Sequence, residues 1–169
     1  KKPKAFILEN VKGLRSHDKG RTLNIILEVL RYDLSYFVPD PKILNSKDFG
    51  LPQNRQRIFI IGFLKKNNFT FPEPLKFKTR VSDILNPGRT PNKYFISQKL
   101  WDSHRARKIK NQTAKPKKGF GYKSVIPSDE YTSTISARYY KDGAEILIKR
   151  RGDPEDMPPR KLTPDEARQ

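Results

Sequence analysis

The first side chains that could do chemistry are those of Glu9 and Asn10, which directly follow the apolar run at positions 5–8. A run this short, β-prone and flanked by charge predicts a strand covered on both faces, as in a parallel sheet under helices. In open α/β sheets, residues just beyond the carboxyl ends of strands line the ligand crevice. Glu9 is therefore a candidate site residue. The alternative is a solvated acid at a strand end.

The second candidate group is the pair Arg55 and Arg57 in the stretch PQNRQRIFIIG. Residues two apart on a strand share a face, so both guanidinium groups project to one side while Ile58 and Ile60 turn to the other. Arginine offers a rigid, permanently charged set of donors that suits a carbonyl oxygen or a phosphate. The alternative is a salt-bridged sheet edge with no binding role.

The elements that must position these groups follow from the spacing of apolar residues. Segment 21–34 carries leucine and isoleucine at helical spacing, which predicts an amphipathic helix packed on the sheet. Segment 36–45 is extended and interrupted by Pro39 and Pro41, and the run 57–64 predicts another buried strand. The first part of the chain is therefore α/β, with the order strand, helix, strand, strand.

A second lobe begins where proline becomes frequent, between positions 71 and 91. It contains the sequence GFGY at 119–122 and two β-prone runs that flank Asp142 and Gly143, a pair typical of a two-residue hairpin turn. We expect this lobe to be small and mostly β.

The charge of the chain favours a polyanionic partner. Lys and Arg number 36 against 18 Asp and Glu, a formal net charge of +18, and nucleic acid is the leading candidate. Between residues 89 and 123, eleven basic residues accompany one acid, Asp102. Such a block repels itself unless a ligand neutralises it; the alternative is a solvated face without function.

Several classes are excluded by what the sequence lacks. With no cysteine, this chain holds no disulfide, no thiolate metal ligand and no cysteine nucleophile. No apolar stretch approaches the length of a membrane span, and the start KKPKAF lacks the apolar region of a signal peptide. We expect an intracellular protein without membrane or metal partners.

Three short motifs occur in a fixed order: Glu9-Asn10-Val11, then Gln53 to Arg57, then Arg160 to Arg168. In the last, Thr163 as N-cap, Pro164 at the first helical position and Glu166 two residues later predict a helix that begins with a capping box. This order, with a basic lobe before the last motif, resembles the DNA cytosine-5 methyltransferases, whose sixth, eighth and ninth conserved blocks the motifs match. The lobe corresponds to that family's target recognition domain. Its GFGY and ISARYYKDGAEILI stretches are similar to bacterial enzymes of the Dcm and HpaII type, whose sites begin with CC and end with GG.

The resemblance implies a partial Rossmann-like methyltransferase sheet in residues 1–72, a recognition domain in 73–158, and a return segment with a helix start in 159–169. The family's loop for S-adenosylmethionine and its Pro-Cys nucleophile loop precede the first motif and are absent. We therefore expect the C-terminal portion of a bacterial, cytoplasmic and nucleoid-associated enzyme, inactive alone. Its partners are double-stranded DNA and the missing N-terminal catalytic portion, in cis or as a second chain.

The resemblance also implies roles for the motif residues. Glu9 contacts N3 and the exocyclic amine of a flipped-out cytosine, and Arg57 donates to its O2. Arg55 holds the nucleophile loop or a phosphate. The remaining motif residues are structural: Asn10, Gln53, Arg160, Thr163 and Glu166.

In the recognition lobe, Arg138 is our choice for a guanine contact, from a hairpin that is narrow enough for the major groove. Ser136, Tyr139, Tyr140, Lys141, Asp142 and Gly143 belong to the same expected interface. Lys115, Lys117 and Lys118 form the densest part of an expected phosphate clamp. The alternatives are that Arg138 and Lys141 contact only phosphate, and that the tyrosines are core residues. The whole chain could instead be a stand-alone DNA-binding or regulatory module, or a basic RNA-binding protein.

Overall fold

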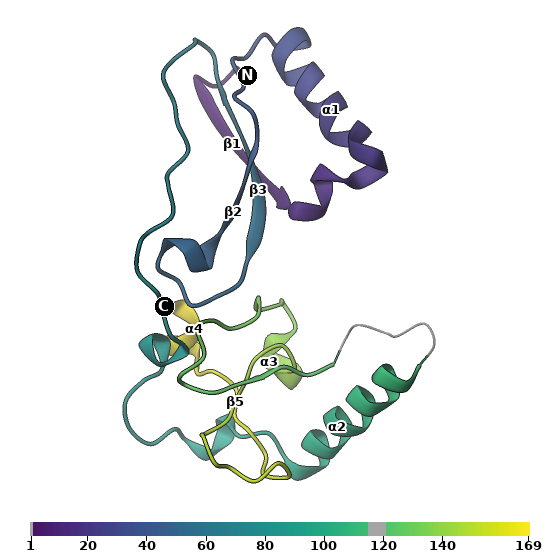
Figure 1. Ribbon diagram of the computed structural model, residues 1–169, viewed down its shortest axis with the longest axis vertical. Coiled ribbons are helices and arrows are strands. Elements are labelled where there is room, and N and C mark those ends of the chain that lie inside the picture. Colours follow the sequence, from purple (N-terminus) through teal and green to yellow (C-terminus); the bar gives the residue numbers. More distant parts are fainter. Residues whose placement is uncertain (1, 115–120) are drawn as a thin grey trace. The chain divides into compact units, whose positions relative to one another are not determined.

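The computed structural model describes residues 2–114 and 121–169, and the chain divides into two compact units (Figure 1). The first unit comprises Lys1–Phe49 and Arg55–Lys76, and the second comprises Gly50–Asn54 and Phe77–Gln169. The short segment Gly50–Asn54 joins the second unit through backbone hydrogen bonds. The N–H of Thr132 donates to the carbonyl of Pro52 at 2.8 Å, and the N–H of Asn54 donates to the carbonyl of Thr132 at 2.9 Å.

The first unit is built on a three-stranded sheet of β1 (Ala5–Val11), β2 (Lys42–Asn45) and β3 (Gln56–Phe63). The strand order is β1-β3-β2, and both pairs are antiparallel. Along β3, burial alternates as the sequence predicts: Ile58 and Ile60 are 1% and 2% exposed, and their neighbours Arg57, Phe59 and Ile61 are only half-buried. The side chains of β3 thus separate into a core face and an outer face.

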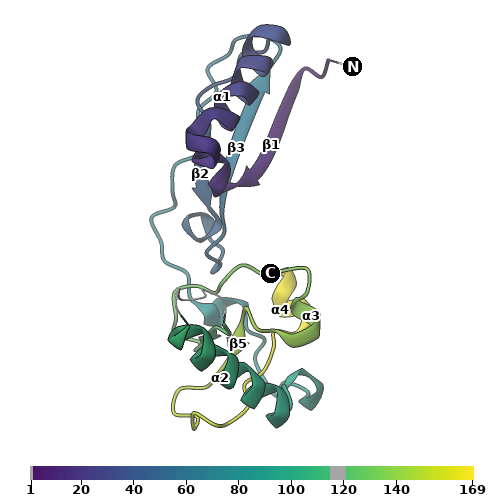
Figure 2. The same cartoon turned by 90° about the vertical axis from the view of Figure 1, so that its right-hand side faces the viewer.

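Helix α1 (Arg21–Glu28), continued by a π-helical turn at Val29–Asp33, packs on the core face of this sheet. Both views show it running along the strands (Figure 1 and Figure 2). Helical spacing brings one row of its side chains onto the sheet. The buried core consists of Leu23, Tyr36, Val38, Ile58 and Ile60, with Phe6, Leu14, Ile26, Leu27, Leu30 and Ile43 packed against it.

The expectation that β1 is covered on both faces in a parallel sheet is wrong for this chain. Its only strand neighbour among the described residues is the antiparallel β3. Ile7 and Val11, which share a face with Glu9, are 68% and 56% exposed. The physical reason is that α1 packs on the opposite face, where Phe6 joins the core but Leu8 stays 43% exposed.

The second unit contains less strand than the sequence analysis expects. Strands β4 (Ser124–Val125) and β5 (Leu147–Ile148) are two residues each and pair in parallel. The longest element is α2 (Gln98–Thr113), followed by the short helices α3 (Tyr139–Asp142) and α4 (Pro164–Arg168). Two clusters form the core: Val81, Val125, Tyr139, Ile146, Ile148 and Leu162, and Ile96, Trp101 and Leu147. Short 3-10 turns in the chain lie at Lys12–Arg15, His17–Gly20, Ser46–Phe49, Val81–Ile84 and Asn92–Tyr94.

The predicted hairpin around Asp142 and Gly143 is wrong, because this stretch forms the single helical turn α3. Tyr139 is 7% exposed, and its hydroxyl donates to the carbonyl of Ile146 at 2.7 Å and accepts from the N–H of Leu162 at 2.8 Å. Burial of that ring fixes the turn. Gly143 ends it with a φ of 64°, and its N–H donates to the carbonyl of Tyr139. A left-handed glycine serves a helix end as well as a hairpin turn.

The predicted helix start at the end of the chain is confirmed. The hydroxyl of Thr163 accepts from the N–H of Glu166 at 3.2 Å, and Glu166 Oε2 accepts from the N–H of Thr163 at 2.8 Å. Pro164 occupies the first turn, where its missing N–H costs nothing.

Candidate functional site

The two predicted chemical groups meet in the first unit. Glu9 Oε1 lies 3.2 Å from Arg55 Nη2 and 3.1 Å from Arg57 Nε. The antiparallel register places Glu9 opposite Phe59 and Val11 opposite Arg57, so the acid and both arginines share the outer face of the sheet. Arg55 and Arg57 therefore converge, as their two-residue spacing on a strand predicts, and the group on which they converge is the Glu9 carboxylate.

The arrangement leaves part of Glu9 available to a ligand. Its side chain is 45% exposed, and those of Arg55 and Arg57 are 39% and 20% exposed. Exposed ion pairs contribute at most about 1 kcal/mol of stability, so folding alone gives little reason for this cluster. Both arginines use Oε1, and within the described chain Oε2 accepts no hydrogen bond. A cavity of about 190 Å³ adjoins the three side chains.

Asn45 is a site residue that the sequence analysis missed. It ends β2, is 5% exposed, and its Oδ1 accepts from the backbone N–H of Arg55 at 2.9 Å. The N–H of Ser46 in turn donates to the carbonyl of Arg55. These bonds fix the backbone from which Arg55 reaches Glu9. The available signal was a polar residue at the end of the apolar run KIL, the same pattern that drew attention to Glu9.

Two other motif residues do not join this cluster. Asn10 lies on the opposite face of β1, and its Oδ1 accepts from the N–H of Val11 at 2.8 Å. Gln53 belongs to the second unit, where it bridges to Thr132. The stretch from Gln53 to Arg57 is therefore divided between the two units.

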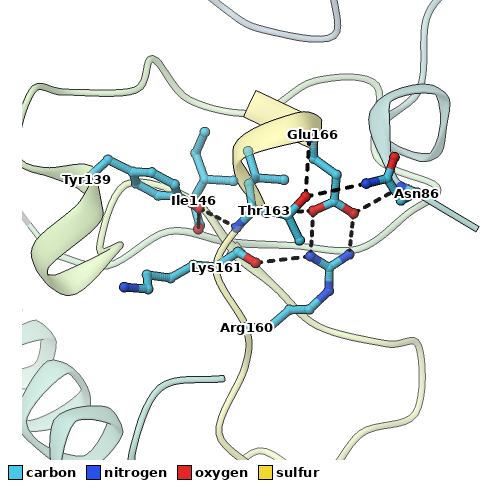
Figure 3. Close-up of polar contacts among 8 residues, drawn as sticks. Asn86, Tyr139, Ile146, Arg160, Lys161, Thr163 and Glu166 are labelled. Carbon is cyan, nitrogen blue, oxygen red and sulfur yellow. Dashed lines mark hydrogen bonds and ion pairs between the residues drawn. The ribbon is translucent and has the colours of Figure 1, made fainter. Parts of the chain in front are cut away.

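In the second unit, Arg160 and Glu166 form a buried ion pair (Figure 3). Arg160 Nη1 lies 2.7 Å from Glu166 Oε2 and Nη2 lies 2.9 Å from Oε1, a two-pronged contact. The N–H of Asn86 donates to Oε1 at 3.0 Å, and the N–H of Thr163 donates to Oε2 at 2.8 Å. Glu166 is 1% exposed, so every oxygen that was removed from water has found a donor.

This network sets the protonation of two buried groups. Burial alone would raise the pKa of Glu166, but the hydrogen bonds from Arg160, Thr163 and Asn86 outweigh burial and hold that pKa below its ordinary value. Burial also raises the pKa of the nearby Tyr139 hydroxyl well above its ordinary value. Glu166 is therefore a carboxylate and Tyr139 a neutral phenol at neutral pH. Both side chains have a structural role, because their hydrogen bonds hold neighbouring segments of the second unit together.

Some of the residues predicted to contact DNA are exposed and others are buried. Arg138, Tyr140 and Lys141 lie at the surface, whereas Tyr139 is a core residue. Arg138 is the N-cap of α3, and its N–H donates to the Ser136 hydroxyl at 3.2 Å. The proposed phosphate-clamp residues Lys115, Lys117 and Lys118 lie outside the described residues.

Much of the basic block lies on α2. Trp101 and His104 bury one side of this helix, each 1% exposed, and Ser97 caps its start by accepting from the N–H of Leu100. Lys108 Nζ lies 4.4 Å from the centre of the Tyr122 ring. The basic side chains that α2 carries are Lys99, Arg105, Arg107, Lys108 and Lys110.

Within 2–114 and 121–169, no helix is long and apolar enough to cross a membrane. In the same residues, no group of three or more His, Asp or Glu side chains is placed to hold a metal ion.

Comparisons with known proteins give consistent results. A family model described as C-5 cytosine-specific DNA methylase matches residues 1–169. The chain is 53% identical over 175 residues to Type II methyltransferase M.SsoII of Shigella sonnei, covering 99% of this chain and 43% of that protein. It is 50% identical over 136 residues to Type II methyltransferase M.HpaII of Haemophilus parainfluenzae, covering 79% of this chain and 37% of the relative. The chain thus spans about half or less of the length of these relatives.

Solved structures share the fold. Entamoeba histolytica methyltransferase EhMeth matches with a TM-score of 0.68 and 19% identity, covering 97% of this chain and 49% of that chain. S. pombe Dnmt2 methyltransferase matches with a TM-score of 0.67 and 17% identity, covering 97% and 52%. At these identities the likeness concerns the fold alone, and it confirms the predicted α/β, Rossmann-like sheet.

Proposed function

The chain belongs to the C-5 cytosine-specific DNA methylase family, and we propose that it supplies the base-binding and DNA-recognition parts of a DNA cytosine-5 methyltransferase. The observation that carries this proposal is the convergence of Arg55 and Arg57 on one oxygen of Glu9, beside a cavity, with the other oxygen open. Its setting is the bacterial cytoplasm, where the substrate DNA lies.

The chemical task is to make C5 of cytosine reactive. Glu9 holds a proton at N3 and accepts from the exocyclic amine, while Arg57 donates to O2, so both stabilise charge that moves into the ring. Arg55 restrains the acid through Oε1. A base reaches such a group only after it leaves the stack, at a cost of a few kcal/mol that contacts to the protein must offset.

S-adenosylmethionine is the methyl donor of this family, but the cavity beside Glu9 is too small for it. The cavity beside Glu9 measures about 190 Å³, whereas small-molecule sites usually measure about 300–1,000 Å³. We assign the cofactor and the cysteine nucleophile to the N-terminal catalytic portion, in cis or as a second chain. Ile7 and Val11 are exposed, and among the residues that the structure describes β1 pairs on one edge only, which supports docking of that portion on this sheet.

The second unit is the DNA-recognition part in this proposal. The basic side chains of α2 supply phosphate contacts, which add affinity but little sequence information. Arg138 reads a guanine from the start of α3, and the site is a short duplex sequence that begins with CC and ends with GG. Exposure of Arg138 and its place beside a cavity of about 350 Å³ support this assignment.

We expect the 169-residue chain alone to transfer no methyl groups, because the nucleophile and the donor site lie elsewhere. Grafted into M.SsoII in place of the matching segment, it should restore methylation. Incorporation of labelled methyl groups into duplexes with CC/GG sites measures both. The control is M.SsoII without its matching segment. A folded chimera that binds DNA without methylating it would contradict the enzyme proposal and favour a stand-alone DNA-binding module.

Replacing Arg138 by Ala should weaken binding to the correct duplex and abolish the preference for guanine at one position, a loss of roughly 1–3 kcal/mol of discrimination. Titration of the chimera against CC/GG duplexes and against duplexes with one guanine replaced measures this. Arg151→Ala is the matched control, since Arg151 is an exposed arginine of the same unit. Equal weakening on all duplexes, with a smaller salt dependence, would show that Arg138 contacts phosphate instead.

A further inference from the structure

Two positively charged arginine side chains line the cavity of about 350 Å³ in the second unit. Arg107 of α2 and Arg138 of α3 both line it, and both are exposed. Across residues 2–114 and 121–169, neither guanidinium group donates a hydrogen bond or forms an ion pair. Both therefore remain available to a ligand rich in acceptors, such as a guanine edge or a phosphate.

Glu145 lines the same cavity but pairs with neither arginine. Its Oε1 accepts a hydrogen bond from the hydroxyl of Ser136. Its Oε2 is buried and, in the part of the chain that the structure describes, has no hydrogen-bond partner. The Glu145 carboxylate is therefore hydrogen-bonded to Ser136 and does not neutralise the charges of Arg107 and Arg138.

Ser136 passes this restraint to Arg138. The Ser136 hydroxyl, which donates to Glu145, accepts from the backbone N–H of Arg138 at 3.2 Å. The carbonyl of Ser136 accepts from the N–H of Tyr139 at 3.1 Å, which ties the same residue to the anchored turn of α3. Serine contacts of this kind fix the local backbone.

We propose that Glu145 is a positioning residue for sequence recognition, which acts through Ser136 to fix the backbone that presents Arg138 to a guanine. This inference rests on the proposed role of Arg138 in DNA binding. A two-pronged contact to O6 and N7 requires a defined direction of approach, whereas an arginine on a loose turn gains only the less directional attraction of phosphates. Glu145 therefore contributes selectivity rather than affinity.

The test compares Glu145→Ala, Glu145→Gln and the control Glu155→Gln in the M.SsoII chimera, on a CC/GG duplex and on one with a guanine replaced. Glu155 is exposed, and its replacement changes the net charge by the same amount as Glu145→Gln. Glu145→Ala should reduce the ratio of the two dissociation constants roughly fivefold or more. Glu145→Gln keeps a carbonyl acceptor for Ser136 and should retain most of the ratio. An unchanged ratio in Glu145→Ala overturns the proposal, and an equal loss in Gln and Ala indicates direct contact with the base and overturns it too.

A measurement without DNA separates this inference from the proposed function. Hydrogen exchange at the Arg138 amide should accelerate in Glu145→Ala and in Ser136→Ala, and change little in Glu145→Gln and Glu155→Gln. Faster exchange in a protein that selects no sequence would sustain the restraint and refute the proposed function. Unchanged exchange in a chimera that does select its site would refute the restraint alone.

Discussion

Replacement of Glu9 by Gln in the M.SsoII chimera should lower the rate of methylation about 100-fold or more, with duplex binding kept within a few-fold. Glutamine is nearly isosteric with glutamate, so its side-chain oxygen can still accept from Arg55 and Arg57. Its amide has no ionisable carboxyl group, however, and cannot stabilise a proton at N3 of the cytosine. An interaction made mainly in the transition state affects turnover and leaves ground-state binding nearly intact. Single-turnover methylation and fluorescence anisotropy measure the two quantities separately.

Glu28→Gln is the matched control, since Glu28 is an exposed acid of α1 in the same unit and should change neither quantity. Arg57→Ala should behave like Glu9→Gln, because O2 then lacks its donor. If Glu9→Gln instead abolished DNA binding and left turnover at saturation normal, the acid would act in docking the DNA, and its assignment to the base would be wrong.

The elements of the first unit were predictable because their apolar residues recur clearly at the spacing of a helix or of a strand. The alternation along β3 and the helical spacing in 21–34 correspond to the strand and the helix observed. The exposure of β1 was not predictable. An apolar run shows which surface needs cover, but nothing in residues 5–8 tells whether the covering element belongs to the same chain.

The candidate site was predictable as a set of residues and not as a geometry. The period of two places Arg55 and Arg57 on one face, yet only the register of β1 against β3 brings them to Glu9. Register depends on contacts across the whole sheet. The contributions of Asn45 and Glu145 were not predictable because their hydrogen-bond partners are ten and nine residues away in the sequence.

The failed hairpin has a different cause. Asp142 and Gly143 satisfy a local rule for a two-residue turn, and the flanking residues are β-prone. Tyr139, however, gains more by burying its ring and satisfying its hydroxyl on Ile146 and Leu162 than a narrow exposed ribbon would give. Tertiary burial overrode local propensity at this point.

The largest expected effect on stability comes from the buried pair of Arg160 and Glu166. Glu166→Ala should lower the free energy of unfolding of the second unit by about 3–5 kcal/mol, because it leaves a guanidinium group buried without its partner. Unfolding in urea, followed by the fluorescence of Trp101, measures this, since Trp101 is the sole tryptophan and is buried in that unit. Asp165→Ala is the control: its exposed pair with Arg168 at 3.6 Å should contribute about 1 kcal/mol or less.

The pH dependence of the free energy of unfolding separates the contribution of the pair's charge from that of its packing. Because the pKa of Glu166 is lower in the folded chain than in the unfolded chain, its stabilisation is fully present above the ordinary glutamate pKa of the unfolded chain and is lost as the pH falls through the lower folded pKa. The wild-type chain should therefore lose more stability between pH 7 and acid pH than Glu166→Ala does. Double replacement by Arg160→Met and Glu166→Leu should recover part of the loss at pH 7, since no guanidinium group is then buried without a partner. The recovery stays partial because the N–H groups of Asn86 and Thr163 lose their acceptor. If Glu166→Ala stayed within about 1 kcal/mol of wild type at pH 7, or showed the same acid dependence, the ion pair would not be what holds α4 to the rest of the second unit.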